Sequence, residues 1–97
     1  MIRHVVLFKF RPEVSAETRA DFVQTLRRLA DEVETVRALE VGVNFTESPR
    51  AHDVALIVDF DDREGLAAYI EHPRHQPVRA RAAALCSTFP VVDYETG

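Results

Sequence analysis

The chain has 97 residues, 46% hydrophobic and 29% charged, a balance typical of one soluble globular domain over residues 1–97. Its 12 basic and 16 acidic residues give a net charge of −4, which argues against nucleic-acid binding through the phosphate backbone. The single cysteine, Cys86, excludes a disulfide within the chain, and no apolar run approaches the ~20 residues of a membrane span. We therefore expect a cytoplasmic protein that does not bind nucleic acid or a membrane.

The first half of the chain predicts a strand, a helix and a second strand. Residues 2–10 are β-branched and aromatic, and their alternation places His4 on a mainly apolar face while Val5 and Leu7 occupy the other. Apolar residues recur at helical spacing over residues 16–31, after a good N-cap at Ser15. Residues 39–45 alternate again and predict the second strand.

The second half repeats this order with an interruption. A loop over residues 46–52 precedes a third strand over residues 53–60, which is apolar on both faces. The next helix ends or bends at Pro73, because proline has no N–H to donate and disfavours helical geometry at the residue before it. A short alanine-rich helix follows over residues 78–85, and residues 89–94 predict a last strand that begins irregularly or lies at an edge because of its proline.

The order β-α-β-β-α-β, with the second helical segment broken in two, predicts an α+β fold. It is the ferredoxin-like arrangement, a four-stranded antiparallel sheet with helices on one face. The other face of the sheet then remains bare, although the first and third strands carry apolar residues there. Contiguous apolar surface of this kind usually marks an interface, so we expect a homodimer in which two sheets face each other as a dimeric α/β barrel.

Chemistry-bearing side chains gather around the helix break. Tyr69, His72 and His75 lie within seven residues and include the groups that move protons near neutral pH. The alternative is structural: Tyr69 would be a core aromatic with a satisfied hydroxyl, and the histidines would cap a helix end. Two roles remain possible for His4 as well. A core histidine bonded to backbone and a pocket histidine fit its apolar neighbours equally well.

Metal binding is disfavoured by the residue pattern. His4, His72 and His75 are the only candidate ligands, and no cysteine pair or carboxylate cluster joins them. We therefore expect no metal and no cofactor. Cys86 has no histidine or lysine near it in sequence to lower its pKa, so we interpret it as a packing residue.

Three segments together resemble the stress-responsive dimeric α/β-barrel (Dabb) family. They are the opening His4-Val-Val-Leu-Phe-Lys-Phe10, the central Tyr69-Ile-Glu-His-Pro-Arg-His75 and the closing Val92-Asp93-Tyr94. The resemblance runs essentially from end to end. It implies a ferredoxin-like subunit and a barrel-shaped homodimer, but a fold hosts many functions and does not decide which one is present.

The resemblance also implies roles for individual residues. In related plant polyketide cyclases, which form olivetolic acid by aldol condensation, Tyr69 and His75 correspond to the catalytic pair, His4 to a pocket histidine and Asp93 to an aspartate near the catalytic histidine. Where those cyclases have a further pocket histidine, this chain has Val54, so a long alkyl polyketide is not implied. The implied pocket lining comprises Val6, Phe8, Phe22, Val23, Leu26, Leu56, Val58, Glu64, Leu66, Ile70, Phe89 and Val91.

Such a cyclisation needs a base that removes a proton alpha to a carbonyl and a donor that holds the resulting oxyanion. His75 is the expected base, with Asp93 holding its second ring nitrogen, and Tyr69 the expected donor. Other classes remain open. The same groups can orient a small ligand in a binding module, the protein can be a structural dimer without a ligand, or it can resemble the cofactor-free monooxygenases of a related dimeric barrel superfamily.

Overall fold

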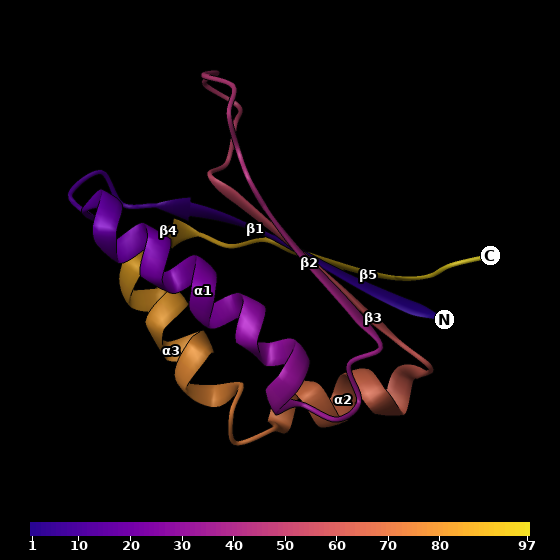
Figure 1. Ribbon diagram of the computed structural model, residues 1–97. Helices are drawn as coiled ribbons and strands as arrows, with labels where there is room; N and C mark the ends of the chain where they lie inside the picture. Colours follow the sequence, from indigo (N-terminus) through magenta and orange to yellow (C-terminus); the bar gives the residue numbers. More distant parts are fainter.

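The computed structural model describes residues 1–97 as one antiparallel sheet with three helices on one face (Figure 1). None of the helices combines the length and the apolar character that a membrane span requires. The elements in chain order are β1 (Ile2–Phe10), α1 (Ala16–Glu32), β2 (Ala38–Val43), β3 (Val54–Phe60), α2 (Arg63–Glu71), α3 (Gln76–Leu85), β4 (Cys86–Thr88) and β5 (Val91–Glu95).

Strand β1 is the centre of the sheet and its alternation is as predicted. It pairs with β3 on one side and with β4 and β5 on the other, while β2 lies beyond β3. Every second residue from Ile2 to Phe10 is buried beneath the helices, including His4, the one polar side chain of this inner face. A buried imidazole among apolar residues needs a partner, because an unpaired polar group in such a place costs about 1–3 kcal/mol.

Helix α1 supplies most of the cover over the inner face. Ser15 caps its N-terminus by accepting a hydrogen bond from the backbone N–H of Thr18. Its apolar stripe includes Phe22 and Leu26, both fully buried, and the Phe22 ring packs edge-on against the ring of Phe8. Burial of each such side chain contributes about 1.5–3 kcal/mol, so this face alone anchors the helix.

The predicted break between the second and third helices is present. Helix α2 begins at an Asp62 cap and ends at Glu71, directly before His72 and Pro73. The chain then turns and α3 begins at Gln76, two residues earlier than expected, with Pro77 in its first turn where a missing N–H costs nothing. The two short helices therefore lie at an angle to one another over the same sheet (Figure 1).

The sheet has five strands where four were predicted. The last segment runs along one edge of β1 in two pieces, because the Phe89–Pro90 step interrupts the ladder between β4 and β5. Proline lacks the N–H that a continuous ladder would use, and edge positions tolerate that loss. The prediction of an irregular edge strand is thus confirmed, whereas the three-residue strand β4 was missed.

The second strand is shorter than the sequence predicted. Strand β2 ends at Val43, and Phe45, expected on the sheet face, is 97% exposed in the connection to β3. In that connection Asn44 bonds to the backbone of Thr46, a local contact that competes with strand pairing. The connection rises beyond the sheet on the side opposite the helices (Figure 1).

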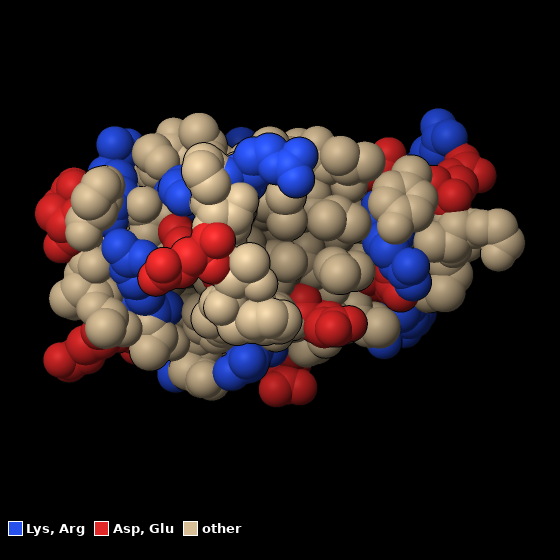
Figure 2. Space-filling view, turned by 90° about the horizontal axis from the view of Figure 1, so that it is seen from above, with Lys and Arg blue, Asp and Glu red and all other residues tan.

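The outer face of the sheet carries no helix. Val5, Ala55 and Ile57 are only half-buried there, and Leu7 is exposed. Figure 2 looks onto this side of the molecule, where a patch of uncharged side chains lies near the middle with charged groups around it. This is the bare apolar face that the strand pattern predicted.

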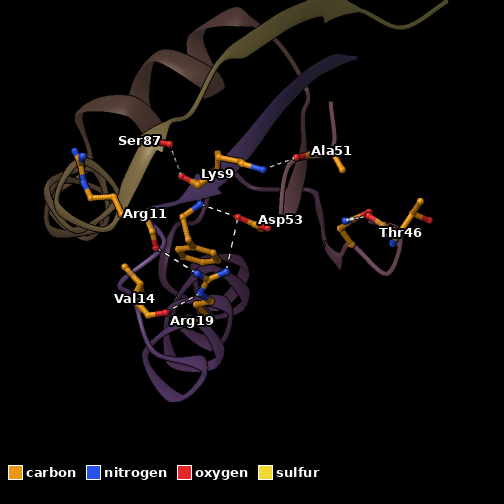
Figure 3. Close-up of polar contacts among 10 residues, drawn as sticks. Lys9, Arg11, Val14, Arg19, Thr46, Ala51, Asp53 and Ser87 are labelled. Atoms are coloured by element: carbon orange, nitrogen blue, oxygen red, sulfur yellow. Dashed lines mark hydrogen bonds and ion pairs between the residues drawn. The ribbon is translucent and has the colours of Figure 1, made fainter. Parts of the chain in front are cut away.

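A group of polar contacts lies where β1 ends (Figure 3). The carboxylate of Asp53 accepts a 2.8 Å hydrogen bond from the backbone N–H of Phe10 and lies 4.0 Å from the guanidinium of Arg19. Arg19 also donates to the carbonyls of Val14 and Arg11 and lies over the Phe10 ring. We call Phe10, Arg19 and Asp53 the Asp53 cluster; it ties the base of the β2–β3 connection to β1 and α1.

Candidate functional site

A cavity of about 230 Å³ lies between the inner face of the sheet and the helices α1, α2 and α3. This volume is slightly below the ~300–1,000 Å³ typical of small-molecule sites, so it suits a small ligand. Ten of the 14 lining residues are hydrophobic. The lining comprises His4, Val6, Phe8, Leu26, Leu56, Tyr69, Ile70, His75, Val78, Arg79, Ala82, Phe89, Val91 and Asp93.

Tyr69 is fully buried beside this cavity, and its hydroxyl has no hydrogen-bond partner in the chain. Its ring packs between two imidazoles, with centroids 4.3 Å from His75 and 5.8 Å from His4. Burial raises the pKa of Tyr69 well above its usual range, so the phenol stays protonated and can only serve as a hydrogen-bond donor or acceptor near neutral pH. The alternative of a core tyrosine with a satisfied hydroxyl does not match this geometry.

The break after α2 sets the tautomer of His75. Because the helix ends there, the carbonyl of Ile70 has no helical partner and accepts from His75 Nδ1 at 3.1 Å and from the side-chain amide of Gln76 at 2.8 Å. A proton on Nδ1 leaves Nε2 with a free lone pair. Burial lowers the pKa of His75, and the nearby Arg79 charge acts in the same direction, so the ring is neutral at neutral pH and its Nε2 can accept a proton.

Asp93 holds His4 rather than His75, and the expectation that it orients the base is wrong. Its Oδ1 accepts from His4 Nδ1 at 2.5 Å, because β5 pairs with β1 in a register that places these two residues opposite each other. Both line the cavity. His4 is therefore satisfied by a carboxylate, not by backbone, and its Nε2 is the nitrogen left without this contact.

Most of the residues implied by the resemblance surround the cavity, but several do not. Phe22 and Val58 are fully buried in the core without lining it, and Val23 and Leu66 line two other depressions. Glu64 is exposed in the first turn of α2. Four of these five residues lie on α1 and α2 and only Val58 lies on the sheet, so the cavity meets less of the two helices than the resemblance implied.

Three lining residues of α3 were missed: Val78, Arg79 and Ala82. Together with His75 they recur three and four positions apart, the spacing of one helix face. That spacing was visible in the sequence, but the alanine-rich composition suggested only a short packing helix.

The remaining histidines lie elsewhere. His72 faces Glu34 at 3.4 Å and accepts from the backbone N–H of Arg74, and His52 Nε2 contacts the Thr88 hydroxyl at 3.2 Å. No group of three or more histidine, cysteine, aspartate or glutamate side chains is placed to hold a metal ion. Cys86 is buried, and burial raises the pKa of its thiol.

Together these side chains present a buried phenol donor and a neutral imidazole base to one small apolar space. The rings of Tyr69 and His75 have centroids 4.3 Å apart, so one small ligand can contact both. That combination suits proton removal alpha to a carbonyl, in which the donor stabilises the enolate oxygen.

Comparison with known proteins agrees with the fold. The family model described as stress responsive A/B barrel domain matches residues 2–96. An uncharacterized protein of Streptomyces coelicolor is 35% identical over 97 residues, covering 98% of this chain and 99% of that protein.

Solved structures give the same result. A dimeric ferredoxin-like protein of unknown function from Thermobifida fusca superimposes with a TM-score of 0.88 at 23% identity, covering 98% of this chain and 90% of that one. A dimeric protein of unknown function and ferredoxin-like fold from Bacteroides fragilis gives a TM-score of 0.80 at 27% identity, over 98% and 95% of the two chains. The predicted family resemblance and the ferredoxin-like fold are thereby confirmed.

Proposed function

This chain belongs to the stress responsive A/B barrel domain family, and we propose that it binds a small, mainly apolar carbonyl compound in the cavity between helices and sheet. One observation carries the proposal: Tyr69 lines the cavity, and its buried hydroxyl has no partner in the chain. An unpaired buried hydroxyl costs about 1–3 kcal/mol, and a ligand that accepts from it removes that cost. A carbonyl oxygen is such an acceptor.

The reaction that these groups support is enolisation of the bound carbonyl. The Nε2 lone pair of His75 takes a proton from the carbon next to the carbonyl, and the electrons of that C–H bond move onto the carbonyl oxygen, which Tyr69 holds by its hydroxyl. The aldol-type cyclisation suggested by the family resemblance begins with this step, and needs no cofactor. Without a carbon electrophile in the same ligand, the proton returns and the ligand is unchanged.

A binding test uses two probes of similar size and shape. Acetophenone carries a carbonyl, and ethylbenzene lacks one. In a titration followed by amide NMR shifts, we expect acetophenone to bind ~10-fold more tightly, since the hydrogen bond to Tyr69 is made only by the ketone. The shifts should centre on Tyr69, Ile70 and His75. Equal affinity for both probes, or shifts scattered over the surface, would contradict the proposal.

We also propose a homodimer formed through the outer face of the sheet, in a cytoplasmic protein. The support is the half-exposed apolar surface around Val5, Leu7 and Ile57, together with two structural relatives described as dimeric. Sedimentation equilibrium should give twice the 11.0 kDa chain mass. Leu7→Asp, which places a charge in this face, should shift the protein toward a monomer, and a parent that is monomeric at micromolar concentration would refute the dimer.

A further inference from the structure

Helix α3 carries two arginines, two positions apart, with different surroundings. Arg81 donates to the carboxylate of Asp21 at 2.7 Å and to the hydroxyl of Thr25 at 3.3 Å, so it ties α3 to α1. Arg79 lines the cavity and takes part in none of the ion pairs or side-chain hydrogen bonds of the chain. Packing of the helix therefore accounts for Arg81 but not for Arg79.

The other ionisable groups of the cavity do not balance the charge of Arg79. Asp93 is the only acidic residue in the lining, and its carboxylate is already engaged by His4. His75 lies one turn before Arg79 on the same face and is neutral. Arg79 is thus an exposed cation beside a mainly apolar cavity, without a counter-ion in the chain.

A guanidinium in this position favours an anionic partner. Its planar donors match a carboxylate, and a charge-assisted hydrogen bond of this kind is stronger than one between neutral groups. The one-turn spacing from His75 corresponds to about 5–6 Å between Cβ atoms. A small ligand can therefore reach Arg79 with one group while a carbonyl lies near Tyr69 and His75.

We propose that the cavity selects a small keto acid, with Arg79 as the specificity-determining residue that binds its carboxylate. This inference rests on the proposed function, because it assumes a carbonyl held by Tyr69. It adds the chemical class of the ligand. The ligand has an apolar body with a carbonyl at one end, and an acidic group separated from that carbonyl by about the width of an aromatic ring. Neutral ketones bind the same cavity, but more weakly.

The test compares 3-acetylbenzoate with 3-acetylbenzamide, which differ in charge and hardly in shape. By NMR titration we expect the acid to bind the parent ~10-fold more tightly, as a charge-assisted contact does at a partly exposed site. Arg79→Gln should remove this preference while leaving the affinity for the amide within about twofold, and Arg79→Lys should retain part of it, because it keeps the charge but loses the fork of donors. Arg28→Gln is the matched control, since Arg28 is an exposed arginine on α1 outside the cavity lining.

The outcomes distinguish this inference from the proposed function on which it rests. If acetophenone and the amide bind at the cavity but the acid has no advantage, selection by Arg79 is refuted and the carbonyl site stands. A preference that survives Arg79→Gln, or that Arg28→Gln removes equally, also refutes it. If none of the three probes binds at the cavity, the proposed function fails and the keto-acid inference fails with it.

Discussion

The Asp53 cluster and the cavity are both polar regions in a small protein, but their hydrogen bonds differ. In the Asp53 cluster the carboxylate, the guanidinium and the backbone groups at the end of β1 contact one another (Figure 3). At the cavity the buried Tyr69 hydroxyl has no partner in the chain, and the exposed Arg79 makes no ion pair or side-chain hydrogen bond. A buried hydroxyl is normally satisfied, so folding explains the contacts of the Asp53 cluster but not the unpaired hydroxyl of Tyr69. The contrast supports the proposal that the Tyr69 hydroxyl is kept for a ligand.

The largest expected effect is on chemistry at the cavity. In D₂O the parent should exchange the methyl protons of acetophenone for deuterium, as followed by the loss of the methyl NMR signal. His75→Gln should slow the protein-dependent exchange by ~10² or more, because it removes the base. Asp53→Ala should leave the exchange rate of the folded protein unchanged. Equal exchange rates for the parent and His75→Gln would mean that His75 is not the base.

The next effect is on stability and belongs to the Asp53 cluster. Asp53→Ala leaves the backbone N–H of Phe10 without its acceptor and removes the charge that faces Arg19. We expect the free energy of unfolding in urea to fall by about 1.5–3 kcal/mol, the usual range for a hydrogen bond to a charged group. Asp31→Ala is the control, since Asp31 is exposed and has no such contact. A similar loss in both variants would mean that only net charge had been measured.

The pH dependence of stability gives a smaller effect with a definite sign. Burial lowers the pKa of His75 in the folded state, whereas the unfolded chain titrates near its ordinary value of ~6.5. Between the two values the unfolded state binds more protons, so the free energy of unfolding decreases as the pH falls below ~6.5 and levels off below the folded pKa.

His75→Gln isolates this contribution, because the other three histidines are present in both proteins. Urea unfolding of parent and variant across this range should show a steeper decrease for the parent. Parallel curves would mean that His75 titrates normally and is not held neutral at the cavity.

The fold was predictable from the sequence because each element carries a local signal. The alternation around β1, the helical stripe behind Ser15 and the break at Pro73 each depend on neighbouring residues only. The errors occurred where pairing between distant segments decides the outcome. Strand β4 exists because three residues meet the far end of β1, and Phe45 leaves the sheet although it continues the alternation of β2.

The sequence predicted that Tyr69 and His75 lie together, but not which groups their neighbours contact. The clustering of Tyr69 and His75 follows from the helix break. The partner of His4 depends on the register between β1 and β5, which places Asp93 opposite it, and no local pattern fixes that register. Arg79 was missed for a related reason: only the packed structure distinguishes an arginine with a carboxylate partner from one without.

The central claim is that the Tyr69 hydroxyl is kept for a ligand, and Tyr69→Phe tests it most directly in the presence and absence of acetophenone. In the free protein we expect the variant to be as stable as the parent, or more stable by about 1 kcal/mol, since it loses an unpaired buried hydroxyl. Acetophenone should then stabilise the parent against thermal unfolding more than it stabilises the variant. A free variant that is clearly less stable than the parent, with the same stabilisation by acetophenone, would show that the hydroxyl serves the fold and would contradict the claim.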